Sequence, residues 1–349
     1  MTGDHAVRLG VSFRGVIVKD VPRSNFNGTF IFAGGLASRL LNGQIVLGAN
    51  GLPILEYITS AERYRRTLSF RQQGLSPSDI RLRGGGHTQF SINGGNAVTT
   101  VSQSSLSGFI QDEWRLRPTL GLSYGLRFET QSNIGRNFDI APRIAFAWAR
   151  ETDKKHKLRA VLRGGFGVFY SRIGENLVLD AIKFDGEHVQ SYRINDPNIL
   201  DSFVNVPQVQ DLVGLGRPIS TRQIAGNIRA PVSYHAALSF EHELPGNSVF
   251  TATYSDLRGR HVLRSRNINA PFLISSQRPI PSFEDIYQYE SNGNFNSRRL
   301  SLNFTTRFWK FRSLYLRYDL GTAKSDTDGA ANFPVNQYNS SEEVWKVIT

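Results

Sequence analysis

The segment from Thr119 to Thr130, TLGLSYGLRFET, alternates strictly between large apolar residues and small or polar residues. Its even positions from Leu120 to Phe128 are apolar, whereas its odd positions carry glycine, serine, arginine and glutamate. Successive side chains of a β-strand point to opposite faces, so this period of two predicts a strand with one apolar face. An α-helix needs a period near 3.6 residues, and no such stripe fits here.

The same alternation recurs along the chain in segments of about ten residues that turn residues separate, which is the pattern of transmembrane β-strands. No segment shows a convincing amphipathic helical pattern. We therefore predict an all-β protein with twelve strands. They lie near 6–18, 25–35, 63–73, 84–94, 105–117, 119–131, 138–150, 157–171, 232–244, 248–260, 297–309 and 313–324.

The predicted connections fall into a short set and a long set that alternate along the chain. The short ones lie near 19–24, 118, 151–156, 245–247 and 310–312, and the long ones at 36–62, 95–104, 172–231 and 261–296. The connection at 74–83 is intermediate in length, and 132–137 is the one short connection on the long side. Outer-membrane barrels have short turns at one end and long loops at the other. A soluble antiparallel sheet explains a single alternating strand equally well, but it does not explain long loops gathered at one end. The pattern favours an antiparallel transmembrane β-barrel.

Large aromatic residues support a membrane location. Trp114 and Trp148 share the apolar face and lie where strands approach the short connections, as an interfacial aromatic girdle predicts. Tyr170 and Tyr234 have the same parity, and we expect them at the lipid interface too. The alternative is that the tryptophans belong to the core of a soluble protein.

The polar faces of the predicted strands carry many charged residues. The candidates for a water-filled lumen are Arg127, Glu129, Arg143, Arg159, Arg163, His235, Glu241, Glu243, Arg307, Arg317 and Asp319. Two interpretations remain open: the arginines favour an anionic ligand or an acidic partner surface, or they pair with the carboxylates across strands. The formal net charge of +12 does not indicate nucleic-acid binding, because the arginines are scattered and not clustered.

The sequence excludes several kinds of chemistry. The chain has no cysteine, so it has no disulfide, thiol nucleophile or thiolate metal site. The seven histidines show no metal-binding spacing, and no catalytic motif such as GxSxG occurs. Asp326 and Asp328 are the only hint of calcium, but the spacing of an EF-hand loop is missing. We expect neither an enzyme nor a cofactor.

Five segments together resemble the barrel of TonB-dependent receptors. They are SGFIQDEWRLRPTLGLSYGLRFETQSN at 107–133, FDIAPRIAFAW at 138–148, LRGGFGVFYSRI at 162–173, HVLRSRNINAP at 261–271 and AKSDTDGAANFPVNQYN at 323–339. The resemblance is to the Oar-like branch of acidobacterial type, whose members often carry a carboxypeptidase-regulatory-like domain upstream. It covers nearly the whole chain, from about Gly3 to Asn339.

The resemblance implies an outer-membrane transporter for TonB-dependent uptake of an unidentified ligand. It implies a plug domain and TonB as partners in the full-length protein, with membrane lipid and lipopolysaccharide around the barrel. Because no plug or regulatory-like domain is recognisable, we expect residues 1–349 to form an incompletely closed part of the barrel. The alternative function is a passive porin-like or structural surface barrel.

Overall fold

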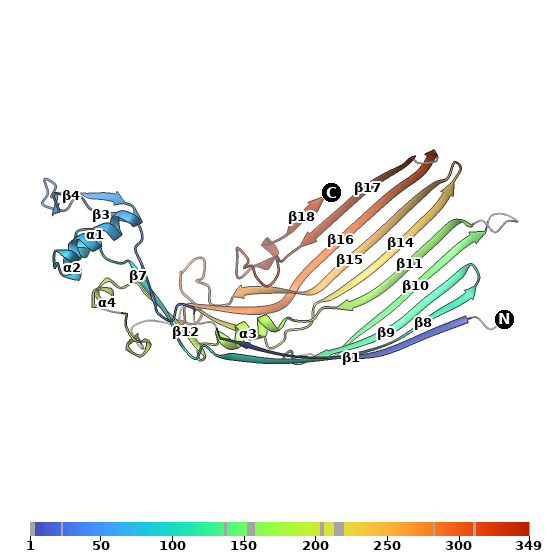
Figure 1. The fold of residues 1–349 in the computed structure, drawn as a ribbon, viewed down its shortest axis with the longest axis horizontal. Coiled ribbons are helices and arrows are strands. Elements are labelled where there is room, and N and C mark those ends of the chain that lie inside the picture. Colours follow the sequence, from blue (N-terminus) through green and yellow to red (C-terminus); the bar gives the residue numbers. More distant parts are fainter. Residues whose placement is uncertain are drawn as a thin grey trace.

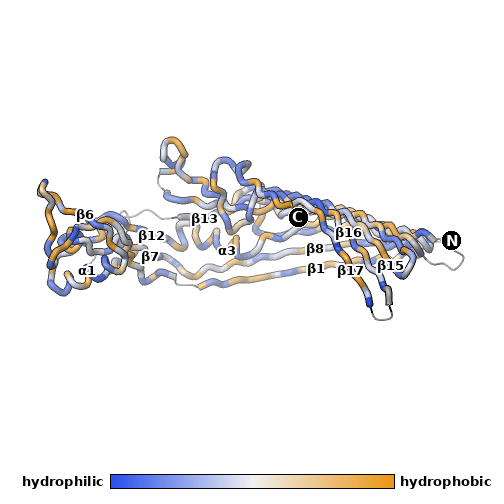
Figure 2. Tube along the Cα trace, turned by 90° about the horizontal axis from the view of Figure 1, so that it is seen from above, coloured by the Kyte–Doolittle hydropathy of each residue, from blue (hydrophilic) through white to orange (hydrophobic). Residues whose placement is uncertain are grey.

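The alternating segments fold into long antiparallel strands, and a smaller head lies beyond one end of their sheet in the computed structural model (Figure 1). The structure describes residues 4–21, 24–135, 138–151, 158–202, 206–212, 220–281, 283–309 and 312–348. Figure 2 shows hydrophilic and hydrophobic positions alternating along β15, β16 and β17. No helix within these ranges is long and apolar enough to cross a membrane.

Nine long strands lie side by side in the order in which the chain forms them. They are β1 (Asp4–Asp20), β8 (Thr99–Arg117), β9 (Leu120–Gln131), β10 (Asp139–Glu151), β11 (Leu158–Tyr170), β14 (Val232–Leu244), β15 (Ser248–Asn267), β16 (Asp285–Trp309) and β17 (Arg312–Ser325). Each corresponds to a predicted strand, although β8, β15 and β16 extend well beyond the predicted ranges. Each pairs antiparallel with its neighbours, so the prediction of an antiparallel barrel sheet is confirmed.

The large sheet remains open, as predicted for an incomplete barrel. β1 is one edge, and the short β18 (Trp345–Ile348) forms the other by pairing with β17. The prediction that 313–324 is an edge is therefore wrong. β13 (Ser220–Ile224) adds an eleventh, parallel strand that pairs with the first residues of β16.

Short and long connections separate to opposite ends of the sheet. Pro118 and Thr119 alone join β8 to β9, and residues 245–247 join β14 to β15. At the other end lie the long connections 21–98, 171–231, 268–284 and 326–344. The predicted short turn at 19–24 is wrong, because β1 pairs directly with β8 and residue 21 begins a long connection. The predicted loop at 95–104 is also largely wrong, since β8 begins at Thr99.

The first long connection builds much of the head, and here three predicted strands are corrected. The segment 63–73 is helical, within α1 (Ser60–Gln72), and α2 (Pro77–Leu82) follows it. The segment 25–35 contains the short β2 (Thr29–Ile31) and the first residue of a second short strand, because Asn25 and Gly28 adopt the positive φ angles of a turn. The segment 84–94 partly forms β7 (Gln89–Gly95), but β7 lies between β2 and β12 (Val189–Ile194) in a separate sheet.

Further short elements complete the head. β3 (Gly35–Ser38) pairs with β6 (Leu55–Ile58), and β4 (Leu40–Leu41) pairs with β5 (Gln44–Ile45). α4 (Pro197–Ser202) and a 3-10 turn (Val209–Leu212) come from the second long connection. They bury Leu200 and Leu212 against Phe90, Ile92, Tyr192 and Ile194, so two connections distant in sequence share one small core.

Two helical elements remain. α3 (Glu175–Lys183) lies in the second long connection, and a 3-10 turn (Ser340–Glu342) precedes β18. α3, which buries Val178, overturns the expectation that the chain has no amphipathic helix.

Candidate functional site

The register of the sheet gathers the charged candidates onto one face. Within the regular part of the sheet, before the bulge that follows Gly259, this polar face carries the odd-numbered residues of β8 to β11 and β14 to β17 and the even-numbered residues of β1. The apolar face carries the others. Ten of the eleven predicted lumen residues lie on the polar face with described side chains. The eleventh, Arg159, lies on β11, but its side chain is outside the described part. That this face borders a lumen stays a proposal.

Several arginines on the polar face form ion pairs with carboxylates. Arg163 reaches Glu241 across the β11–β14 pair at 3.1 Å, and Arg317 reaches Asp319 at 2.7 Å. Arg127 likewise donates to Glu129. These contacts favour the interpretation that the arginines pair with neighbouring carboxylates, although two of the three pairs lie along a strand and not across strands.

Small residues and one aromatic cluster shape the centre of the polar face. The Arg143 guanidinium lies 4.3 Å from the centre of the Phe169 ring, and the His235 imidazole meets the edge of the same ring at 4.8 Å. Beside them, Gly125, Gly165 and Gly167 help to line a hollow of about 310 Å³. A cation–π contact stabilises Arg143 without neutralising it, so its positive charge remains available to that hollow.

The segment after β11 folds back over the polar face. Gln103 on β8 and Gln131 on β9 donate to the Ile173 carbonyl at 3.0 and 2.9 Å. Ile173 in turn donates its own N–H to the Gln131 side chain at 3.1 Å, and it is fully buried. No sequence pattern predicts this contact, because the alternation predicts a face for Gln103 and Gln131 but not what covers that face.

Ion pairs continue this anchoring along α3. Glu175 accepts from Arg14 on β1, and the bonded Arg14 lowers the pKa of the Glu175 carboxyl. At the other end of the helix, Lys183 lies 2.9 Å from Asp20 of β1. In the middle, Asp180 accepts from Arg222 at 2.8 Å, and Arg222 also donates to the Tyr289 hydroxyl of β16. α3 therefore links the first strand of the sheet to the outer end of β16.

The predicted interfacial aromatics all follow the register of the apolar face. Trp148 is exposed, and Trp114 stacks on the His5 imidazole with ring centres 5.1 Å apart. Tyr234 is exposed, with 36% of its surface accessible, whereas Tyr170 packs against Ala141, Val168 and Val232. Their contact with lipid stays a proposal. The side chain of Trp309, a further tryptophan at a strand end, lies outside the described residues.

Asp112 is an acidic residue on the apolar face. Asp112 shares the register of Trp114, but His5 and the Tyr124 hydroxyl meet its carboxylate at 2.6 and 2.7 Å, which leaves Asp112 buried. Neighbouring β1 still exposes Leu9 and Val11, each 76% accessible, on the same face. An exposed apolar surface of this kind is typical of a site that contacts a membrane or another protein.

The head is held by a charge network around α1. Arg66, only 7% accessible, lies 2.8 Å from Glu56 and 2.9 Å from Glu62. It also donates to the carbonyl of Ser38 at 2.8 Å, so it joins three parts of the head. Hydrogen bonds from Arg65 and Arg66 lower the pKa of Glu62 to about 2.

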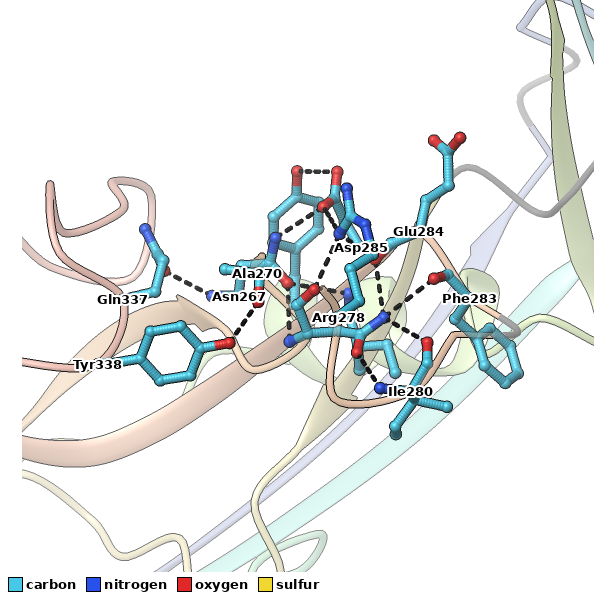
Figure 3. A network of polar contacts seen from close by, with 12 residues as sticks. Asn267, Ala270, Arg278, Ile280, Phe283, Glu284, Asp285, Gln337 and Tyr338 are labelled. Carbon is cyan, nitrogen blue, oxygen red and sulfur yellow. Dashed lines mark hydrogen bonds and ion pairs between the residues drawn. The ribbon is translucent and has the colours of Figure 1, made fainter. Parts of the chain in front are cut away.

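A second polar network fixes the loop between β15 and β16. The side chain of Asn269, which is fully buried, donates to the carbonyls of Ile280, Phe283 and Glu284 at 2.9 to 3.0 Å. Arg278 lies 2.9 Å from Asp285 within the same network (Figure 3). Internal hydrogen bonds and this ion pair thus hold the loop together.

The described residues contain no group of three His, Asp or Glu side chains that could hold a metal ion. Asp326 instead accepts from the Asn294 backbone N–H at 2.6 Å and lies 3.1 Å from Arg264.

The sequence matches one known protein family. The model of the outer membrane beta barrel domain matches residues 1–137 and 133–345. A search of curated protein sequences found no match.

Several solved structures are similar over part of their length. The outer membrane transporter YddB from Escherichia coli is 13% identical with a TM-score of 0.49, over 69% of this chain and 27% of that protein. The siderophore receptor PirA from Pseudomonas aeruginosa is 13% identical with a TM-score of 0.34, over 68% and 49%. The FrpB iron transporter from Neisseria meningitidis is 9% identical with a TM-score of 0.36, over 78% and 30%. The chain thus spans less than half of each of these proteins.

Proposed function

The chain belongs to the outer membrane beta barrel domain family, and from this premise we propose that it forms part of an energised uptake receptor of the TonB-dependent class. Membership places the chain in the cell outer membrane. The finer assignment, to the Oar-like branch, is supported by the five segments between residues 107 and 339 that resemble those receptors.

The observation that carries this proposal is an open sheet in which nine long strands pair each with the next and the first does not pair with the last. The diameter of a β-barrel grows with its strand number, and small barrels fill their interior with their own side chains. A sheet that is still open at this size belongs to a wider barrel. Barrels of about 22 strands have a lumen wide enough to need a plug.

The mechanism follows from the two ends of the sheet. The long connections capture a ligand on the outside, since outer-membrane barrels place their long loops there. A plug domain within the lumen then rearranges when TonB pulls on it, and the ligand passes along the polar face. In this scheme Arg143, Arg307 and the paired charges around Arg163 and Arg317 line the path. The ligand remains open, and no enzymatic step is needed.

Planar-bilayer recording of the full-length protein tests this function. We expect almost no ion conductance from the intact protein, because the plug fills the lumen. Deletion of the plug domain should produce large, steady channels, and this variant is the positive control for insertion. Steady conductance from the intact protein without an energy source contradicts energised uptake and indicates a passive porin-like barrel.

A further inference from the structure

The apolar face changes abruptly in character along β14 to β17. One row of paired residues across these strands is Leu238, Tyr254, Leu300 and Leu320. The next row towards the long connections is Ala236, Asp256, Arg298 and Thr322, and the one after it is Tyr234, Arg258, Asn296 and Lys324. Apolar residues therefore give way to charged residues within one step of the register, and the second step, with Arg258 and Lys324, is cationic. Such a change is expected at the boundary between hydrocarbon and lipid headgroups.

Positive charge is in excess at this boundary. The single carboxylate of Asp256 lies 2.7 Å from Arg258 and 3.1 Å from Arg298, so two guanidinium groups share one negative charge. Arg260 donates to the Gly259 carbonyl and to Asn296 at 2.7 and 3.0 Å, and it has no carboxylate partner among the described residues. Both Arg258 and Arg298 keep more than half of their side chains accessible.

Two hollows meet at this cationic boundary and share Tyr234 and Arg260. The lower hollow, of about 490 Å³, is lined by Phe166, Tyr234, Ala236, Asp256, Arg258 and Arg260. The upper hollow, of about 730 Å³, is strongly polar, and Arg229, His261, Asn292 and Asn294 line it. Arg266 also borders the upper hollow, but Glu290 neutralises it at 2.7 Å. Together they form one groove that is apolar at its lower end and cationic and amide-rich at its upper end.

We propose that this groove binds a phosphorylated glycolipid of the outer leaflet, of the lipopolysaccharide class. An acyl chain lies against Phe166 and Ala236, and a phosphate accepts from Arg258 and Arg260. Guanidinium groups bind phosphate in a bidentate manner, which adds geometry to charge. Sugar hydroxyls fill the upper hollow, where amide and hydroxyl side chains hydrogen-bond them.

The shape of the groove selects a glycolipid over a phospholipid. A phospholipid headgroup would satisfy the arginines but leave the upper hollow empty. The groove also lies on the side of the long connections, which in outer-membrane barrels faces the external leaflet. The proposal depends on this orientation and is independent of whether the protein transports a ligand.

Binding of purified lipopolysaccharide to the full-length protein in detergent, measured by native mass spectrometry, tests the proposal. We expect Arg258→Gln with Arg260→Gln to weaken binding at least tenfold, because each lost charge-assisted hydrogen bond contributes about one such factor. The matched control is Arg163→Gln with Arg299→Gln, which removes two charges from the polar face of the same sheet. Equal weakening by the control pair contradicts a localised site.

Binding of other lipids to the protein without substitutions gives a second test. Dephosphorylated lipopolysaccharide should bind at least tenfold more weakly, and equal binding would overturn recognition of phosphate. Vesicles of phosphatidylglycerol should not displace bound lipopolysaccharide. If they compete as well as lipopolysaccharide itself, the groove is a general anionic-lipid surface and the glycolipid assignment is wrong.

Discussion

At the scale of the residue, the two faces of β9 predict opposite responses to the same substitution. Leu126 lies on the apolar face and is exposed, so Leu126→Arg places a charge in hydrocarbon if that face meets lipid. We expect the variant to lose about 2–4 kcal/mol of folding free energy near the bilayer midplane. Equilibrium unfolding of the full-length protein in lipid vesicles measures this loss.

The control for that substitution is Ser123→Arg, which lies on the polar face of the same strand. It should cost well under half as much, because a polar lumen solvates the guanidinium. Gly125 is not an equivalent control: a Cβ there would lie 2.9 Å from the Ile110 carbonyl oxygen, so any side chain strains the sheet. Equal penalties at Leu126 and Ser123 would contradict the assignment of the faces.

Glu62 makes the stability of the head dependent on pH. Its pKa in the folded protein is about 2, below the ordinary value of 4.5, because it accepts hydrogen bonds from Arg65 and Arg66. A lowered pKa means that ionised Glu62 stabilises the head fully above pH 4.5, and that this stabilisation is lost as the pH falls towards 2. Glu62→Gln should cost about 1–3 kcal/mol at neutral pH, as for loss of hydrogen bonds to charged groups.

Hydrogen exchange of the α1 amides, corrected for the intrinsic rate at each pH, reports this free energy of local opening. The native protein and the Glu62→Gln variant should differ at neutral pH and converge near pH 2. Glu187→Gln removes a carboxylate that makes no ion pair within the described ranges, so it should leave the α1 amides unchanged. A constant difference at every pH would contradict the role of the Glu62 charge.

At the scale of the element, alternation predicted the sheet well and the head poorly. All nine strands of the barrel were predicted because each must present one apolar face, which fixes a period of two. The segment 63–73 was misassigned because the buried face of α1 carries Arg63 and Arg66, which hydrogen bonds and ion pairs satisfy. The signal for this helix was local: Thr59 caps the Glu62 N–H in the manner of a capping box.

The candidate site shows the same division. Register alone placed the ten described charged candidates on one face, because parity is a property of each strand. It could not predict that Ile173 and α3 cover part of that face, since these contacts join segments that are far apart in sequence. The groove around Tyr234 and Arg260 was also missed, because it depends on which residues of neighbouring strands pair.

The strength of the α3 anchor is concentrated at Gln131. Its side chain holds both the N–H and the carbonyl of the buried Ile173. Gln131→Ala therefore leaves the buried N–H of Ile173 without its partner, whereas the carbonyl keeps its hydrogen bond from Gln103. We expect this variant to lower the free energy of local opening of the segment 171–183 by about 2 kcal/mol. Arg14→Gln removes a half-exposed ion pair to Glu175 and should cost less than about 1 kcal/mol.

Hydrogen exchange of residues 173–183 in the full-length protein separates these two variants. The amides should exchange at least tenfold faster in Gln131→Ala, and only a few-fold faster in Arg14→Gln. The control is Gln223→Ala. Gln223 lies in the same connection, and the substitution removes its exposed side-chain hydrogen bond to Gln288 of β16. A larger effect for Arg14→Gln than for Gln131→Ala would show that charge, and not backbone hydrogen bonding, anchors the segment.

At the scale of the whole molecule, the open edge of β1 requires a partner. Within the described chain β1 pairs only with β8, so one side of this 17-residue strand offers unpaired N–H and C=O groups. Lipid supplies no hydrogen bonds, and each unsatisfied backbone group there costs several kcal/mol. We therefore expect another strand of the full-length protein to pair with β1 and close the barrel.

Hydrogen exchange in bilayers measures whether this pairing occurs. All amides of β1 from Leu9 to Ile17 should exchange slowly in the full-length protein, because their N–H groups are bonded to β8 on one side and to the closing strand on the other. Exchange that is fast at every second residue would mean that the edge stays open. A single cysteine at Val11 distinguishes the source of the partner, since the chain has no other cysteine. A disulfide-linked dimer under oxidation would show that a second copy covers β1, and its absence together with slow exchange supports closure within one chain.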